Sequence, residues 1–148
     1  MLVPLSWLDD FVRWGGPVAG LAERLTMSGL TVDGVTEVGR LGARVRVGRL
    51  LAIEPHPGAE RLAVCRVEVG EGAPVIVVSG APGLAAGQLV AVALPGARLA
   101  TGREVEAVEL RGVSSAGVLC SEAELGLGDG AAGVLVLPAD TTPGTRLD

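Results

Sequence analysis

The side chains of this 148-residue sequence best suited to chemistry are His56, Cys65, Ser114 and Cys120. Ser114 lies in a Gly-Val-Ser-Ser-Ala-Gly run that imitates the nucleophile elbow G-x-S-x-G, but the second glycine comes one position late. A serine nucleophile also needs a positioned base, and the single histidine lies in a distant, proline-flanked loop. His56 and the two cysteines lack the paired spacing of zinc ligands. We therefore predict no catalytic residue and no metal site.

Phosphate binding by arginine is the chemistry that remains. All twelve basic residues are arginine, and residues 40–66 hold six of them against two acidic residues, although the whole chain has a net charge of −5. The guanidinium group stays charged and can donate two parallel hydrogen bonds to a phosphate. Arg44, Arg46 and Arg66 fall on the polar faces of two expected strands, with Arg49 and Arg61 near the strand ends. The pattern predicts one basic patch, and solvated arginines paired with glutamates are the alternative.

The pattern of residues 40–148 predicts a barrel of short strands. Apolar and polar residues alternate in short runs separated by turn residues, a spacing typical of a sandwich or small barrel. Gly48 is expected to mark a bulge, and Ser121 and Glu124 predict a capped helical turn. The expected fold is mainly β, a Greek-key barrel of the oligonucleotide/oligosaccharide-binding (OB) type, with a small α/β segment before it. The expected strands are residues 43–54, 62–69, 74–79, 89–94, 104–110 and 134–137.

Residues 1–39 predict two helices and a strand that cannot form a core by themselves. Ser6 is expected to cap the first helix, the second helix to run from Pro17 to Gly29, and residues 31–38 to form a strand. All three aromatic residues of the chain lie in the first fourteen positions. A piece this small cannot bury them alone. Trp7 and Trp14 are therefore expected to be at least partly exposed.

The composition excludes several broad classes of protein. Residues 72–97 carry no charge, but three prolines and five glycines divide them, so we predict no membrane span. Two cysteines are too few for a disulfide scaffold, which favours a cytoplasmic protein. The barrel segment has no aromatic residue, which excludes aromatic base-stacking platforms there.

Several segments resemble a known family in order and spacing. Residues 54–62, 79–82 and 110–121 look like successive signatures of the EMAP-II-like tRNA-binding domain. Residues 4–12 and 25–35 resemble the opening of the bacterial phenylalanyl-tRNA synthetase beta-subunit family. The resemblance spans essentially the whole chain.

The resemblance implies an accessory role in a larger ligase. Residues 1–39 would be the first part of an α/β domain completed downstream, and residues 40–148 an OB-fold tRNA-binding domain. The partners would be tRNA, the remaining beta-chain domains and the alpha subunit, in an alpha2-beta2 heterotetramer. Aminoacylation of tRNA(Phe), with ATP and magnesium as cofactors, would belong to the alpha subunit, and this fragment would hold no cofactor. A structural module with little RNA contact and a freestanding tRNA-binding protein are the alternatives.

The candidate tRNA-binding residues have two origins. Those implied by the resemblance are His56, Arg61, Arg111, Ser114 and Ser115. Those from the charge pattern are Arg44, Arg46, Arg49 and Arg66. The resemblance leaves open whether Arg111 instead pins its own loop to a carbonyl or carboxylate. Because residues 40–148 sum to a charge of −2, RNA affinity is expected to be weak.

Overall fold

The computed structural model describes residues 3–36, 44–70, 72–130 and 133–147. The chain divides into two compact units, Met1–Glu37 and Val38–Asp148, called here the helical unit and the barrel unit. Each is described separately.

The helical unit contains two short helices, α1 (Leu5–Asp9) and α2 (Val18–Met27). Proline occupies the N-cap position of both helices, so Ser6 lies inside α1 and the prediction that it caps the helix is wrong. Helix α2 ends where Gly29 takes a positive φ of 95°, as expected of a glycine that follows a helix.

The strand expected over residues 31–38 is not formed by residues 31–36, and residues 37–38 lie outside the described ranges. The described part of the helical unit offers no neighbouring strand to complete a hydrogen-bonded ladder, and an isolated strand is not stable in water. None of the described residues 3–36 is buried. Trp7 is 67% exposed and Trp14 is partly exposed, as predicted.

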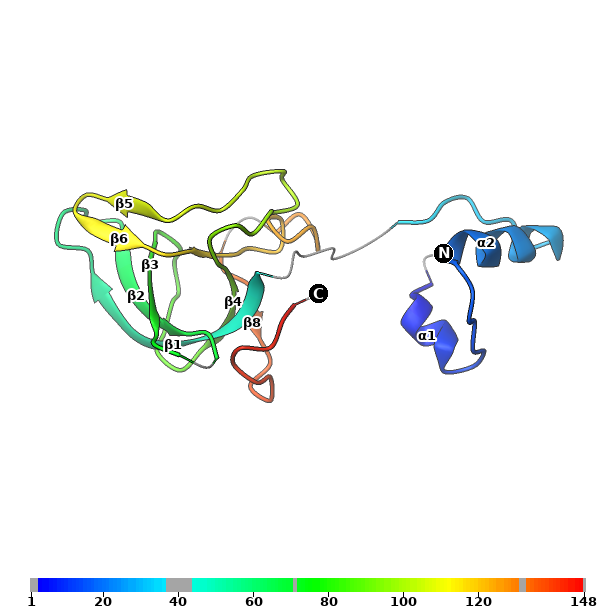
Figure 1. The fold of residues 1–148 in the computed structure, drawn as a ribbon, viewed down its shortest axis with the longest axis horizontal. Helices are drawn as coiled ribbons and strands as arrows, with labels where there is room; N and C mark the ends of the chain where they lie inside the picture. Colours follow the sequence, from blue (N-terminus) through cyan, green and yellow to red (C-terminus); the bar gives the residue numbers. More distant parts are fainter. Residues whose placement is uncertain (1–2, 37–43, 71, 131–132, 148) are drawn as a thin grey trace. The chain divides into compact units, whose positions relative to one another are not determined.

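The barrel unit is an antiparallel, nearly closed barrel, which confirms the mainly β prediction (Figure 1). The main sheet has the order β3-β2-β1-β4-β7, with β8 also paired to β4. An Ala116 N–H···O=C Ile76 hydrogen bond of 2.8 Å brings the β6–β7 segment back to β3. The strands are β1 (Val45–Pro55), β2 (Ala63–Glu68), β3 (Val75–Ser79), β4 (Leu89–Ala93), β5 (Val108–Leu110), β6 (Val113–Ser115), β7 (Val118–Leu119) and β8 (Val136–Leu137).

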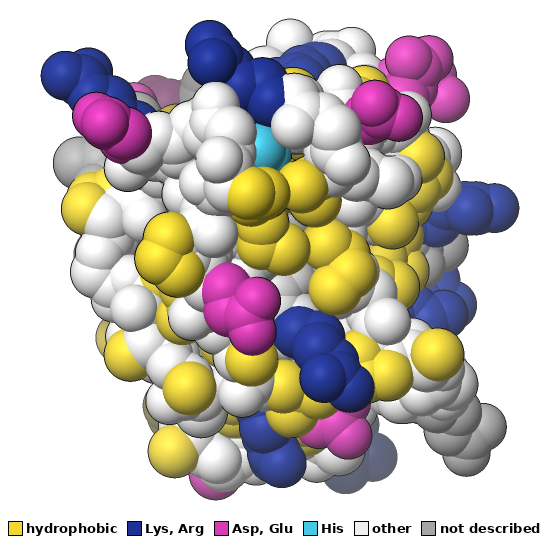
Figure 2. All heavy atoms as spheres, turned by 90° about the vertical axis from the view of Figure 1, so that its left-hand side faces the viewer, with side chains coloured by type: hydrophobic (Ala, Val, Ile, Leu, Met, Phe, Trp, Pro, Cys, Tyr) yellow, Lys and Arg dark blue, Asp and Glu magenta, His cyan; other side chains and the backbone are white. Residues whose placement is uncertain are grey.

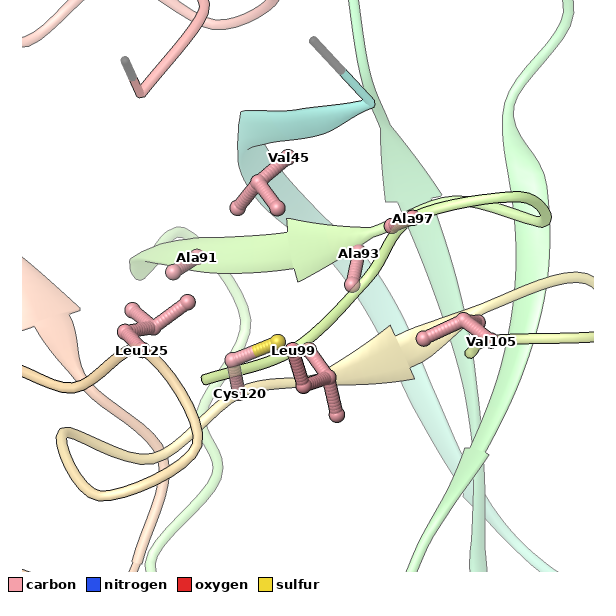
Figure 3. Packing of buried hydrophobic residues seen from close by; sticks show 8 residues of the cluster. All are labelled: Val45, Ala91, Ala93, Ala97, Leu99, Val105, Cys120 and Leu125. Atoms are coloured by element: carbon pink, nitrogen blue, oxygen red, sulfur yellow. The ribbon is translucent and has the colours of Figure 1, made fainter. Parts of the chain in front are cut away.

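Strand β4 separates two apolar clusters because its side chains alternate between them. The interior cluster fills the barrel and consists of Leu50, Cys65, Val67, Val77, Val90, Val92 and Leu119. The second cluster covers the other face of β4 and consists of Val45, Ala91, Ala93, Ala97, Leu99, Val105, Cys120 and Leu125 (Figure 3). All five residues of β4 are buried as a result.

Gly48 permits close packing rather than forming the bulge expected there. Its pairing with Val90 continues the β1–β4 register without interruption, and the register shift on β1 falls between Leu50 and Ala52. A Cβ at position 48 would lie 2.5 Å from Val92 Cγ2 and 2.6 Å from Val67 Cγ1. Glycine is required because the interior cluster fills this space.

Of two other local predictions, one is confirmed and one is only partly right. The capping box is confirmed, since Glu124 Oε2 accepts the Ser121 N–H at 2.9 Å and Ser121 Oγ accepts the Glu124 N–H at 3.3 Å. The strand expected over residues 104–110 is shorter, because only Val108–Leu110 pairs in a ladder. Glu104 makes an isolated bridge to Arg98.

Candidate nucleic-acid interface

Side-chain hydrogen bonds tie together two segments of the barrel unit, the β1–β2 loop, residues 56–62, and the turn region of the β5–β6 hairpin, residues 110–114. We call them together the loop cluster. His56 joins them: its Nδ1 accepts the Gly58 N–H at 2.9 Å, so its Nε2 carries the hydrogen that meets the Leu110 carbonyl oxygen at 2.9 Å. Only 5% of His56 is exposed, and it lies recessed in the face shown in Figure 2. Both ring nitrogens are therefore engaged in holding the two loops together.

Arg111 makes a second tie between the same loops. Its Nη1 donates to the Gly58 carbonyl oxygen at 3.2 Å, so the structural role left open for Arg111 is present. Its φ of 49° is unusual for a residue other than glycine and is kept only where the surroundings fix it. The residue as a whole remains exposed. Because a guanidinium has five N–H donors, Arg111 can hold its loop and still donate outward.

The two serines of the third signature have different roles. Ser115 is 1% exposed, and its Oγ accepts the Val78 N–H at 3.0 Å and donates to the Gly117 carbonyl oxygen at 3.1 Å. Ser114 is exposed at the start of the returning strand. The expectation that the Ser115 and His56 side chains face RNA needs correction, because both are buried in internal hydrogen bonds. They position the loops instead.

Arg61 lies at a shallow hollow of about 590 Å³ beside the loop cluster. The hollow is lined by residues 53–55 and 60–63, at the two ends of the first signature, and by residues 79–82, the second signature. Glu54 and Glu60 also line it, and the sequence analysis missed both although they stand inside a quoted signature. The third signature is joined to the first through His56 and Arg111. All three signatures therefore meet in one region of the barrel unit.

The strand arginines do not form the single patch that was predicted. Arg46 pairs with Val92 and so lies on the same face of the sheet as that residue. The side chains of Val92 and Val67 both belong to the interior cluster. Arg66 is the sequence neighbour of Val67 and so points to the opposite face of the sheet. The register therefore separates Arg46 from Arg66.

Two further arginines are held near the same strand. Arg44 Nη1 donates to the Pro95 carbonyl oxygen at 2.8 Å. Arg49 Nη1 lies 3.9 Å from Glu68 Oε2, which is a loose ion pair. Both residues are exposed.

The position of the loop cluster agrees with the way this fold binds ligands. OB-type barrels bind oligonucleotides on the face of their second and third strands and on the loops after the first and fourth strands. In this barrel those loops are residues 56–62 and the segment from residue 94 to residue 112, which contains β5. His56 and Arg111 tie these two loops together.

The cysteines contribute no reactive group to this surface. Burial raises the pKa of the Cys65 thiol. Burial, together with the nearby Glu124 carboxylate, raises the pKa of Cys120 to about 12, against a smaller lowering by a hydrogen bond with the Ala93 backbone. Figure 3 shows the Cys120 sulfur among apolar side chains beside Leu99. Both thiols stay protonated at neutral pH.

The described ranges hold neither a metal-binding cluster nor a membrane-spanning helix. No three histidine, cysteine or acidic side chains there are grouped so that they could hold a metal ion. In the same ranges, no helix is both long enough and apolar enough to span a bilayer.

The nearly closed antiparallel barrel and its tied loops define an OB-type nucleic-acid-binding module. Residues 45–146 match the family model described as "Putative tRNA binding domain", and the chain belongs to that family. The chain is also 44% identical, over 99% of its length, to the phenylalanine–tRNA ligase beta subunit of Nitratidesulfovibrio vulgaris. It is 48% identical, over 86% of its length, to the beta subunit of Thermosynechococcus vestitus.

The chain spans 18% and 16% of the length of these two curated relatives. Among solved structures it is similar to the C-terminal domain of Plasmodium vivax p43, with a TM-score of 0.53 and 22% identity. That likeness covers 76% of this chain and 62% of the other, and it supports the fold.

Proposed function

We propose that the chain is the tRNA-binding accessory region of a phenylalanine–tRNA ligase beta chain. It would support aminoacylation of tRNA(Phe) carried out by the alpha subunit, in an alpha2-beta2 heterotetramer in the cytoplasm. ATP and magnesium would act at the alpha subunit. The match of residues 45–146 to the family model carries the proposal, and the identity to ligase beta subunits over nearly the whole chain supports it.

In this proposal the loop cluster is the surface that contacts tRNA. The exposed groups are Arg61, Arg111 and Ser114, which would bind backbone phosphates and 2′-hydroxyls. His56 and Ser115 would keep these loops in one conformation, so that little ordering entropy is lost on binding. The strand arginines Arg44, Arg46, Arg49 and Arg66 would make separate contacts.

Binding by this surface is expected to be weak and to depend on salt. The Arg61 hollow also holds Glu54 and Glu60, so phosphates are attracted only locally. Kd at physiological salt should lie on the order of 10⁻⁴–10⁻⁵ M, the range of non-specific binding. Each phosphate neutralised should add about 0.7–0.9 to the slope of log affinity against log salt.

The test is tRNA binding by the 148-residue chain over a salt series, followed by fluorescence anisotropy of labelled tRNA. The double change Arg61→Gln and Arg111→Gln should weaken binding by about tenfold and lower the salt slope by about 1–2. The matched control, Arg13→Gln with Arg24→Gln in the helical unit, removes the same charge and should have little effect. Equal binding by the loop variant and the parent would overturn the proposed surface.

The helical unit would be the first part of a domain completed by a later segment of the beta chain. Its exposed apolar side chains support this, since Phe11 is 85% and Met27 84% exposed. The same exposure favours a second candidate function, a structural module that packs on neighbouring domains with little RNA contact. Absence of tRNA binding even at low salt would favour that second function.

A further inference from the structure

A second hollow lies where β1 and β2 meet the C-terminal segment of the barrel unit. It has a volume of about 690 Å³ and is lined by Arg46, Arg49, Glu68, Gly70 and residues 142–144. We call it the Arg46–Arg49 hollow. It shares no lining residue with the Arg61 hollow.

Backbone hydrogen bonds fix one wall of this hollow. The C-terminal segment runs along β1, where the Gly144 N–H donates to the Val47 carbonyl oxygen at 2.7 Å and the Val47 N–H donates to the Thr145 carbonyl oxygen at 2.8 Å. A third bond joins the Leu147 N–H to the Val45 carbonyl oxygen at 3.0 Å. These bonds place residues 142–144 without any contribution from side chains.

Two glycines fix the other wall. Gly70 and Gly144 have positive φ angles of 107° and 86°. A Cβ on Gly144 would lie 2.5 Å from the Gly70 Cα, and a Cβ on Gly70 would lie 2.9 Å from the Gly144 Cα. The turn after β2 and the C-terminal segment therefore touch through their backbones, and the hollow is preformed.

Arg46 has an unsatisfied donor in this region. Its Nε is buried and finds no acceptor among the residues that the structure describes. Leaving a buried donor of a charged group without a partner is unfavourable. An isolated antiparallel β-bridge pairs Arg46 with Arg146 of the C-terminal segment, so a second arginine lies beside Arg46. Arg46 also lines the hollow, so a negatively charged acceptor bound there would lie against its guanidinium group.

Arg49 also lines the hollow and is held only loosely. Its separation of 3.9 Å from Glu68 is too long for a hydrogen bond, and the two side chains are 47% and 39% exposed. Such surface pairs contribute little. Among the described residues of the lining, two guanidinium groups stand against one carboxylate, and Thr142 adds a hydroxyl. The parallel N–H donors of a guanidinium group and the O–H of a hydroxyl group can both donate to the oxygens of a phosphate.

We propose that the Arg46–Arg49 hollow is a phosphate-binding site. Arg46 and Arg49 donate to the phosphate oxygens, and Thr142 donates through its hydroxyl. The phosphate comes either from the backbone of a bound tRNA or from a free phosphate or phosphorylated small molecule. Only the tRNA source rests on the proposed function. The site itself is independent of the loop cluster.

The first experiment uses inorganic phosphate as the probe. NMR spectra of the arginine Nε–H and backbone amide groups of the 148-residue chain are recorded during a phosphate titration at constant ionic strength. The Arg46 Nε–H signal and the amides of residues 142–144 should shift in a saturable way. Arg46→Gln should weaken this binding by about tenfold, whereas Arg13→Gln should leave it unchanged. Arg49→Gln, at a more exposed side chain, gives the same test if Arg46→Gln does not fold.

The second experiment distinguishes the sources of the phosphate. If tRNA supplies it, Arg46→Gln weakens tRNA binding and inorganic phosphate competes with tRNA for the site. If the ligand is a free phosphate, Arg46→Gln loses phosphate binding while tRNA binding stays at the parental level. Absence of saturable shifts, or phosphate binding that neither arginine variant weakens, overturns the site. Binding of tRNA by the parent chain is measured separately. A failure of the phosphate site therefore does not count against the proposed function.

Discussion

The barrel unit and the helical unit bury their apolar side chains to very different extents. In the barrel unit, β4 is buried along its whole length between two apolar clusters, and Leu50, Val67 and Val92 are completely inaccessible. In the helical unit no described residue is buried, and Phe11 is 85% exposed. The barrel unit therefore has a core of its own, whereas the helical unit needs another surface to cover it.

The two units also differ in what holds their loops. In the barrel unit, His56, Arg111 and Ser115 join loops and strands far apart in the chain by hydrogen bonds across more than thirty positions of sequence. In the helical unit the side-chain hydrogen bonds span three to six positions, as between Trp14 Nε1 and the Pro17 carbonyl oxygen. Long-range ties preorganise a binding surface, and local ties do not. This difference is one reason for proposing that the RNA contacts lie in the barrel unit.

The largest expected effect distinguishes the buried core of the barrel unit from the exposed apolar side chains of the helical unit. Leu50→Ala should lower the free energy of unfolding of the barrel by about 2–5 kcal/mol, because it leaves a cavity in the interior cluster. Phe11→Ala, which removes a larger but exposed side chain, should change it by less than about 0.5 kcal/mol. Urea unfolding followed by circular dichroism measures both. A large effect of Phe11→Ala in a proven monomer would contradict the difference between the units.

Removing the His56 ties should have a smaller effect, confined to the barrel. His56→Ala leaves the Gly58 N–H and the Leu110 carbonyl without their partner and should cost about 1–3 kcal/mol. Both tryptophans of the chain lie in the helical unit, so their fluorescence reports on that unit alone. The barrel transition should move while the fluorescence spectrum in buffer stays the same. An altered spectrum would show that the units are coupled.

Alkaline pH should also destabilise only the barrel. The pKa of Cys120 rises from 9.0 in the unfolded chain to about 12 in the folded one, so the unfolded state loses its proton first and stability falls as pH rises above 9. The expected loss is about 1 kcal/mol at pH 10. The chain has no lysine or tyrosine to titrate in this range. Because burial also raises the pKa of Cys65, Cys120→Ala should reduce the pH dependence without removing it, and an unchanged profile would contradict the assignment.

The strands could be predicted wherever one face of the chain is buried. Alternation placed Cys65 and Val67 inside and Arg66 outside, as the structure has them. The short strands Val113–Ser115 and Val118–Leu119 were not predicted, because serines and glycines interrupt their alternation. Val113–Ser115 forms only as the second arm of a hairpin with Val108–Leu110, and Val118–Leu119 forms by pairing with the distant strand β4. The bulge was misplaced because Gly48 faces a filled interior. Residues distant in the sequence decide whether a glycine in a strand marks a bulge or allows close packing, so the sequence pattern alone could not distinguish the two.

The candidate site could be found by sequence only in outline. The three signatures were recognised, but which side chains are exposed depends on hydrogen bonds between the loops. His56 and Ser115 carry polar groups typical of a binding surface, and the fold uses both internally. The single arginine patch failed because a register fixed by pairing with β4 puts Arg46 and Arg66 on opposite faces.

The most direct measurement is a map of tRNA contacts on the labelled chain. Amide chemical shifts are followed by NMR while tRNA is added at low salt, with the parent and the Arg61→Gln/Arg111→Gln variant compared. The account predicts that the shifts of the parent concentrate in residues 58–62 and 111–114, stay small in α1 and α2, and decline in the variant. Shifts confined to the helical unit, or a loop cluster unmoved at saturating tRNA, would contradict it.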